Sequence, residues 1–517
     1  MQTAIHNPQK ITGKKKSAAP PDFAHPWQPD QGDGTYCNPV LYADYSDADA
    51  IRVGDDFYLV ASSFNSTPGL PVLHSKDLVN WIIIGHALKN LPHSRYEKVQ
   101  SGEGVWAPAI RYHAGKYWVF YPTPDEGIFF VTADHPAGPW SKPHCVQSGK
   151  GLIDPCPLWD DDGKAYLVHA YAGSRAGIKH RLRVCPMSPD GSKLLGEGKI
   201  VFHEPEKHPT LEGPKFLKKD GWYYILAPAG GVETGWQLAL RSKNIFGPYE
   251  EKIVLAQGGT DINGPHQGAL VDTPDDGWWF LHFQDAGLYG RVIHLQPVEW
   301  RDGWPLMGKN GEPVRRHTKP ILVRGQKPLS PQTSDDFGGN NLGLQWQWNA
   351  NHQNAWYSLS ARPGWLRLFP QTAANPLNEQ PNLLLQKFPA RSFVVETELQ
   401  LSPLECGEEA GLVVAGEKSV MLGIQHDGLK NWLVLRTDEK LERLWNVGSH
   451  PVKLRAALRD DGQCAFSFAV DGEFIPVPQT FKATKGKWIG AKVGLYGLKS
   501  ANFSPAGHAD FDNFRFL

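Results

Sequence analysis

The chain has 517 residues and is close to electrically neutral, with 53 Lys and Arg against 54 Asp and Glu and a formal net charge of −1. Because it has no basic stripe, it is a poor candidate for binding nucleic acid or anionic membranes. No run of eighteen apolar residues occurs, which excludes a membrane-spanning helix. The chain is longer than one typical domain, and its 19 Trp, 16 Tyr and 23 Phe give more aromatic surface than a core needs.

Residues 1–33 are polar and are predicted to be a disordered tail. They include Lys14-Lys15-Lys16 and Pro20-Pro21, and they lack the apolar stretch of about 7–15 residues that a secretory signal peptide needs. We therefore expect the protein to be cytoplasmic, or exported with a signal that was removed before this numbering begins.

Five glycine turns recur along residues 34–325, and each leads from a polar, acidic run into an aromatic strand. The glycines are Gly54, Gly115, Gly163, Gly221 and Gly277. A period of about 55 residues, with aromatic and β-branched runs broken by Gly, Pro, Asn and Asp, is typical of propeller blades. The sequence therefore predicts a five-bladed β-propeller over this region.

The first strand of each propeller blade lines the central channel, so residues at one offset before the repeated glycine face the same space. Counting back nine residues from the glycine reaches Trp106, Asp154 and Glu212 in blades two, three and four. Asp47 and His266 take the comparable places in blades one and five. Carboxylates brought together away from water raise one another's pKa, so a cluster of three is costly and is typical of a functional site.

Each of these residues also has an ordinary structural interpretation. Asp154 precedes a proline and could be a turn residue. Glu212 could be a loop charge, Asp47 could belong to a solvated acidic loop, and Trp106 could be part of the core. Their shared offset in the repeat favours the functional interpretation.

The character of the sequence changes near residues 325–335, where prolines and polar residues follow the last blade. Residues 335–517 then contain short alternating strands, such as 392–401, 411–415, 432–436 and 464–470. Alternation with turns about every dozen residues predicts a β-sandwich, of the lectin-like jelly-roll type. The whole chain is thus predicted to be all-β, a five-bladed propeller followed by a C-terminal sandwich.

Six short motifs occur in order along the propeller region. They are Asn38-Pro-Val-Leu41, Tyr45-Ser-Asp-Ala-Asp49, Val105-Trp-Ala-Pro108, Ile153-Asp-Pro155, Leu211-Glu-Gly-Pro-Lys215 and Gly264-Pro-His-Gln-Gly268. Together they resemble glycoside hydrolase family 43, over residues 34 to about 310. The sandwich resembles the accessory domain of the two-domain β-xylosidases and α-L-arabinofuranosidases of that family. Ala48 departs from the pattern, because many relatives carry Pro there.

The resemblance implies that the enzyme hydrolyses a glycosidic bond with inversion, with Asp47 as the general base and Glu212 as the general acid. Asp154 would orient the acid and raise its pKa by like-charge repulsion. Phe64 and Trp106 would stack on the sugar in the terminal subsite. For the two aromatic residues, a role in the core is the alternative.

The resemblance also implies roles for two basic residues and for the sandwich. Arg291 would reach the acid or the sugar hydroxyls, unless it is a surface arginine. His266 would border a calcium or sodium ion otherwise held by water, unless it is a satisfied core imidazole. No cofactor is required for the chemistry, and a structural ion such as calcium is expected near the propeller axis. In relatives of this architecture a loop of the sandwich reaches the mouth of the active site.

The implied substrate is a pentose-containing plant polysaccharide, as xylo-oligosaccharide, xylan or arabinose-substituted xylan. We expect an exo-acting β-xylosidase with α-L-arabinofuranosidase activity, because D-xylopyranose and L-arabinofuranose place similar hydroxyls in similar space. An arabinan-directed arabinofuranosidase or arabinanase is the alternative enzyme, distinguished by an open groove. A non-catalytic carbohydrate-binding protein is the alternative of another class, because fold does not fix function. The sequence leaves the oligomeric state open.

Overall fold

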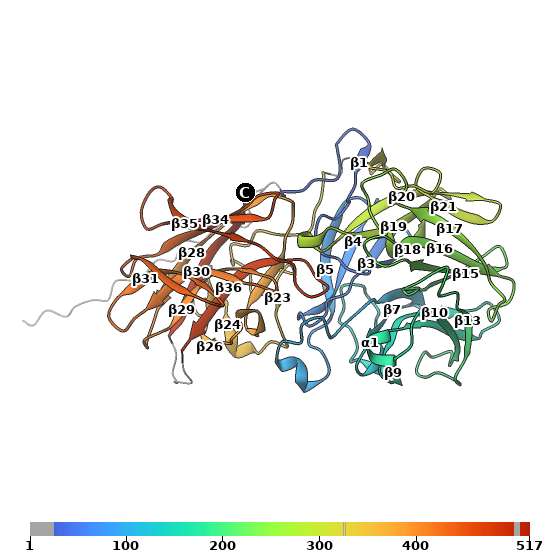
Figure 1. The fold of residues 1–517 in the computed structure, drawn as a ribbon, viewed down its shortest axis with the longest axis horizontal. Helices are drawn as coiled ribbons and strands as arrows, with labels where there is room; N and C mark the ends of the chain where they lie inside the picture. The colour runs from blue at the N-terminus through green and yellow to red at the C-terminus, as the bar shows by residue number, and fades with distance from the viewer. Residues whose placement is uncertain (1–24, 324, 326, 501–506) are drawn as a thin grey trace, which may run out of the picture.

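The computed structural model describes residues 25–500 and 507–517, apart from residues 324 and 326. Two bodies lie side by side: a five-bladed propeller, drawn from blue to yellow in Figure 1, and a sandwich, drawn in orange and red. The predicted all-β architecture is confirmed. Among the described residues, no helix has the length and apolar character needed to cross a membrane.

Each blade is a four-stranded antiparallel sheet whose strands follow one another in sequence order. Blade one contains β2 (Asp49–Val53), β3 (Asp56–Val60), β4 (Gly69–Ser75) and β5 (Trp81–Leu88). Blade two contains β6 (Ala109–His113), β7 (Lys116–Thr123), β8 (Gly127–Ala133) and β9 (His144–Ser148). Blade three contains β10 (Leu152–Trp159), β11 (Ala165–Tyr171), β12 (Leu182–Met187) and β13 (Lys199–Phe202). Blade four contains β14 (Lys215–Lys219), β15 (Trp222–Ala229), β16 (Trp236–Ser242) and β17 (Glu250–Ala256). Blade five contains β18 (His266–Asp272), β19 (Trp278–Asp285), β20 (Arg291–Arg301) and β21 (Trp304–Met307).

The five repeated glycines all lie in the turn between the first and second strands of a blade. Four of these turns, at Gly54, Gly115, Gly163 and Gly221, have φ between 63° and 81°, which glycine adopts without steric cost. The first strand of each blade runs toward this turn. The residues just before the first strand therefore lie at the opposite face of the propeller. That face therefore receives the residues at the shared offset.

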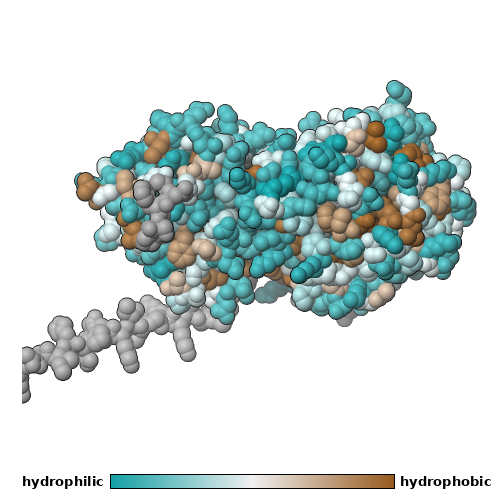
Figure 2. Space-filling model, turned by 90° about the horizontal axis from the view of Figure 1, so that it is seen from below, coloured by the Kyte–Doolittle hydropathy of each residue, from teal (hydrophilic) through white to brown (hydrophobic). Residues whose placement is uncertain are grey.

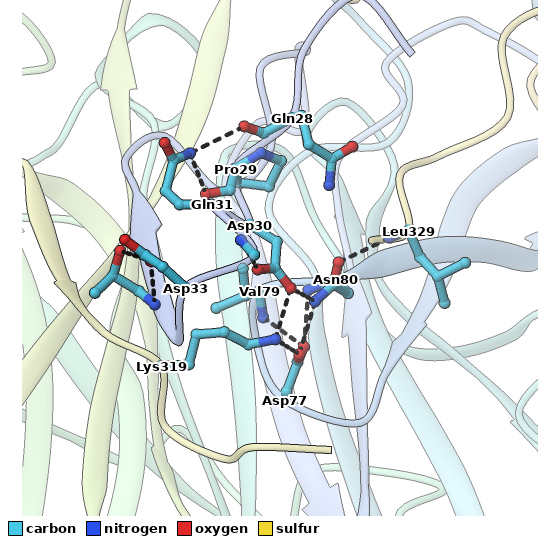
Figure 3. Close-up of polar contacts among 12 residues, drawn as sticks. Gln28, Pro29, Asp30, Gln31, Asp33, Asp77, Val79, Asn80, Lys319 and Leu329 are labelled. Carbon is cyan, nitrogen blue, oxygen red and sulfur yellow. Dashed lines mark hydrogen bonds and ion pairs between the residues drawn. The ribbon is translucent and has the colours of Figure 1, made fainter. Parts of the chain in front are cut away.

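The two ends of the propeller chain meet beside blade one. β1 (Thr35–Cys37) pairs antiparallel with β22 (Arg316–Thr318). Next to this pair, the buried Lys319 Nζ lies 2.6 Å from Asp30 Oδ2 and 2.8 Å from Asp77 Oδ2 (Figure 3). Asn80 Nδ2 donates to the same two carboxylates at 2.8 and 2.7 Å. These contacts tie the N-terminal segment, blade one and the segment after the last blade together.

The segment before β1 belongs to the folded propeller. Trp27 packs on Tyr42 with ring centroids 5.0 Å apart, and Asp30 is buried in its ion pair. The prediction of a disordered tail over residues 1–33 is therefore wrong for residues 25–33, because contacts distant in sequence hold them. Residues 1–24 lie outside the described residues.

The sandwich consists of two sheets. One sheet contains β23 (Gln347–Trp348), β27 (Leu384–Lys387), β36 (Lys492–Lys499), β29 (Glu409–Ala415), β30 (Val420–His426), β31 (Asn431–Thr437) and β32 (Leu441–Asn446), with β26 (Gln371–Thr372) pairing with β36. The other contains β24 (Tyr357–Ser358), β25 (Leu366–Leu368), β37 (His508–Phe516), β28 (Phe393–Ser402), β33 (Val452–Leu458), β34 (Gln463–Ala469) and β35 (Ile475–Lys482). The described helices are single turns: α1 (Gly173–Ala176), η1 (Ser94–Glu97), η2 (Gly287–Tyr289), η3 (Asn354–Trp356) and η4 (Leu377–Glu379).

The sandwich core continues into the propeller. Tyr42, Tyr289 and Val292 of the propeller belong to the same buried apolar cluster as the sandwich residues between the two sheets. Polar contacts add to this interface, since the Asn351 side chain bonds both the amide and the carbonyl of Leu91, each at 2.8 Å. The two bodies are thus joined by a packed interface.

The outer surface in Figure 2 is mostly hydrophilic, with hydrophobic side chains gathered in separate spots.

Candidate active site

Six of the predicted site residues line one cavity of about 330 Å³. They are Asp47, Phe64, Trp106, Asp154, Glu212 and Arg291. All six belong to loops or strand ends on the face of the propeller where the first strands begin. The structure therefore brings together the residues that the repeat and the family resemblance predicted.

The backbone around the cavity is strained at several positions. Asp47, Phe64 and Asp154 have φ values of 53°, 50° and 57°, in the left-handed region that non-glycine residues rarely adopt. Four more lining residues share this conformation: His180, Thr210, Gln267 and Trp488. Such residues cost roughly 1–3 kcal/mol each and concentrate at functional sites, where the surrounding structure holds them. The strain is an independent indication that this cavity is the functional site.

Asp47 is held by two donors. Arg291 Nη1 lies 2.7 Å from Asp47 Oδ1, and Ser62 Oγ donates to Asp47 Oδ2 at 2.8 Å. The side chains of Asp47 and Arg291 are only 9% and 11% exposed. The Arg291 guanidinium also lies over the Phe283 ring, 4.9 Å from its centroid. The direction in which the Asp47 carboxylate points is therefore fixed by side chains that cannot easily move.

Asp154 and Glu212 act on each other's protonation. Burial raises the pKa of both carboxyl groups, and the charges of Asp154 and Asp47 raise the pKa of Glu212 further. The Gly213 amide donates to Asp154 Oδ2 at 2.8 Å and favours the ionised form of Asp154. The proton of this pair therefore resides on Glu212, whose side chain is 30% exposed. A protonated carboxyl group thus borders the cavity that an ionisable Asp47 also lines.

His266 lies behind Glu212 instead of lining the cavity. Its Nε2 is 3.6 Å from Glu212 Oε1, and burial lowers the pKa of the imidazole to about 3, so the ring is neutral. Neither ring nitrogen has a hydrogen-bond partner among the described residues.

The residues around His266 do not by themselves make a calcium site. Calcium takes 6–8 oxygen ligands, and the described part of the chain holds no group of three or more His, Cys, Asp or Glu side chains that could bind a metal ion. An ion beside His266 stays a prediction in which water would supply most of the ligands.

Two aromatic side chains form walls of the cavity. Trp106 Nε1 donates to the Gly102 carbonyl at 3.0 Å, and the Arg175 guanidinium lies 5.1 Å from the centroid of the Trp106 ring. Phe64 is fixed by its backbone, which exchanges hydrogen bonds with Val105 at 2.9 and 3.0 Å. Both rings are positioned to offer an apolar surface to a bound sugar.

The lining residues that the sequence reasoning missed include Tyr171, Gln267 and Trp488. Trp488 comes from the sandwich, in the loop between β35 and β36, and the residue is 53% exposed. This loop packs closely on Gly102, where an added Cβ would lie 2.9 Å from Trp488 Cδ1. A tryptophan in a short loop between Gly486 and Gly490 was the available signal.

Comparison with known families agrees with this geometry. Residues 36–305 match the glycosyl hydrolases family 43, and residues 334–517 match the β-xylosidase C-terminal concanavalin A-like domain. The chain belongs to glycoside hydrolase family 43. It is therefore a glycoside hydrolase, as the sequence predicted.

Relatives share both domains. A protein of Xylanibacter ruminicola is 41% identical over 90% of this chain and 86% of its own. A β-xylosidase of Formosa agariphila is 34% identical over 94% of this chain and 91% of its own. The non-reducing end α-L-arabinofuranosidase BoGH43B of Bacteroides ovatus is 31% identical over 93% of this chain and 94% of its own. The crystal structure of xylan β-1,4-xylosidase from Bacillus halodurans has a TM-score of 0.82 at 27% identity, covering 93% of this chain and 99% of that chain.

Proposed function

We propose that the protein is an exo-acting, inverting β-xylosidase that also hydrolyses α-L-arabinofuranosides. Its substrates are xylo-oligosaccharides, xylan and arabinose-substituted xylan. The observation that carries the proposal is that Asp47 and Glu212 line one cavity whose wall includes Trp488 of the sandwich. A cavity of about 330 Å³ lies at the small end of the range for ligand pockets. This size favours one or two sugar rings over a long chain, and the β-xylosidase and α-L-arabinofuranosidase relatives support both activities.

The terminal sugar binds first, between the aromatic walls. Phe64 and Trp106 contact the apolar faces of the ring and exclude water from the cavity. Arg291 and Ser62 hold the Asp47 carboxylate so that it faces a water molecule on one side of the anomeric carbon. The carboxylate takes a proton from this water as the water oxygen forms a bond to the anomeric carbon.

The glycosidic bond breaks on the opposite side of the ring. Glu212 gives its proton to the leaving oxygen, and the bonding electrons stay with that oxygen. Its pKa is raised by burial and by the Asp154 charge, so the proton is still present near neutral pH. Attack from one side and departure from the other invert the anomeric configuration. Asp47 then carries a proton and Glu212 is ionised, and exchange with solvent restores both.

Chromogenic aryl β-D-xyloside and aryl α-L-arabinofuranoside test the proposal in one assay. We expect release of the aglycone from both substrates, and loss of both activities in Asp47→Asn, because the attacking water then loses the carboxylate that takes its proton. Activity on neither substrate, or full activity in Asp47→Asn, would contradict the proposal.

A further inference from the structure

Asp44 is a buried carboxylate at the boundary between the propeller and the sandwich, outside the cavity. Its Oδ1 accepts hydrogen bonds from the Arg291 amide at 3.0 Å and from Ser46 Oγ at 2.8 Å. Its Oδ2 accepts a hydrogen bond from the Gly490 amide of the sandwich at 3.0 Å. The mechanism above does not use this carboxylate.

The two backbone donors to Asp44 belong to segments that each line the active-site cavity. Gly490 lies two residues after Trp488, in the sandwich loop that borders the cavity. Arg291 reaches Asp47 with its guanidinium at 2.7 Å. One carboxylate thus connects the sandwich loop to the arginine that holds the general base.

The packing around Asp44 leaves little room for adjustment. A Cβ added at Gly290 would lie 2.5 Å from Asp44 Cγ. A Cβ added at Gly490 would lie 2.7 Å from the Gly290 nitrogen. The Ala491 amide also donates to the Leu288 carbonyl at 2.8 Å. Because the backbones at residues 288–291 and 490–491 are in direct contact, a shift of the sandwich loop must move the backbone of Arg291.

Two lysines of the sandwich interact electrostatically with the same carboxylate. Burial lowers the pKa of the Lys387 and Lys492 ammonium groups, and the charge of Asp44 opposes that lowering for both. A neutral side chain at position 44 would therefore leave these lysines without compensation, and the docking of the sandwich would weaken.

We propose that Asp44 is a positioning residue through which the docked sandwich sets the backbone of Arg291 and hence the orientation of Asp47. The inference rests on the proposed function, because it takes Asp47 as the general base. Its consequence is that the sandwich contributes to the rate of the chemical step, as well as to the shape of the pocket.

Substitution of Asp44, with a matched control at the same interface, tests this inference. Asp44→Asn keeps the size of the side chain, but its NH2 group must face a backbone N–H group, that of either Gly490 or Arg291. Two donors then face each other, and one hydrogen bond is lost. We expect kcat to fall by about 10- to 100-fold with little change in KM, because a displacement near 1 Å costs about that much in rate. Asn351→Ala removes the contacts with Leu91 and touches no cavity residue, so it should lower the melting temperature and keep kcat.

The leaving group separates an effect on the base Asp47 from an effect on the acid Glu212. An effect transmitted to Asp47 lowers kcat/KM by the same factor for aryl xylosides with good and poor leaving groups, since the base acts on water in both cases. Asp44→Ser, which is smaller and still accepts one hydrogen bond, replaces Asp44→Asn if the latter does not fold. A folded Asp44 variant with kcat within twofold of the wild type would overturn the inference, and so would a loss of kcat in Asn351→Ala as large as that in the Asp44 variant. Wild-type turnover and the Asp47→Asn result test the proposed function separately.

Discussion

The clearest electrostatic prediction concerns Asp154, whose charge raises the pKa of Glu212. Asp154→Asn keeps the size of the side chain, and its amide oxygen can still accept the hydrogen bond from the Gly213 amide. Burial and the Asp47 charge continue to raise the pKa of Glu212, so only the part due to Asp154 is lost. One neighbouring charge shifts a carboxyl pKa by about 1–2 units, or about 1.4–2.8 kcal/mol.

The sign of the shift follows from the role of the acid. Glu212 works when it is protonated, so its deprotonation sets the alkaline limb of activity. Removing the Asp154 charge lowers the pKa of Glu212, and we expect the alkaline limb of kcat/KM to move about 1–2 units toward lower pH. The pH profile should be measured with an aryl xyloside whose leaving group needs a proton. Asp162→Asn, in the exposed turn of the same blade, is the control that leaves the limb in place. An unchanged alkaline limb and full activity in Asp154→Asn would show that Asp154 is only a structural residue.

Three further predictions follow. Glu212→Gln should lose about 10²–10⁴-fold activity on substrates with poor leaving groups and much less on aryl glycosides with good ones; equal losses would remove Glu212 from the acid role. Deletion of residues 335–517 should leave the propeller insoluble or inactive, because Tyr42 and Tyr289 would lose the apolar cluster that covers them; a soluble propeller with full activity on short xylo-oligosaccharides would refute this. Burial lowers the pKa of Lys492 to about 7 from 10.5, so the unfolded state binds more protons between those values and wild-type stability rises with pH there. Between pH 7 and pH 10, the free energy of unfolding measured in urea should rise less in Lys492→Met than in the wild type, by up to about 1.4 kcal/mol for each unit by which the Lys492 pKa is lowered. An equal rise in the two proteins would contradict a lowered pKa of Lys492.

Much of the propeller could be predicted from the sequence, because a repeat places equivalent residues at equivalent positions. The glycine period located the turns between the first two strands of every blade, and the shared offset brought Asp154 and Glu212 to one cavity. Phe64 and Arg291 occupy no repeated position, and they were recognised only through the family resemblance. The structure places both of them in the same cavity.

The features that escaped prediction depend on contacts between distant parts of the chain. Trp488 reaches the cavity only because the sandwich docks on the propeller, and Asp44 meets Gly490 across 446 residues of sequence. The boundary of the N-terminal tail was misplaced for the same reason. Asp30 is ordered by Lys319, 289 residues away, which composition and local pattern do not reveal.

The stereochemistry of the released sugar tests the central claim most directly. The account assigns Asp47 to activate water and Glu212 to protonate the leaving oxygen, so a β-xyloside should be hydrolysed by a single displacement. Proton NMR spectra recorded in the first minutes of hydrolysis should show α-xylose accumulating before mutarotation produces the β-anomer. If β-xylose appears first, the reaction proceeds with retention through a covalent intermediate, and the assignment of Asp47 as a general base is wrong.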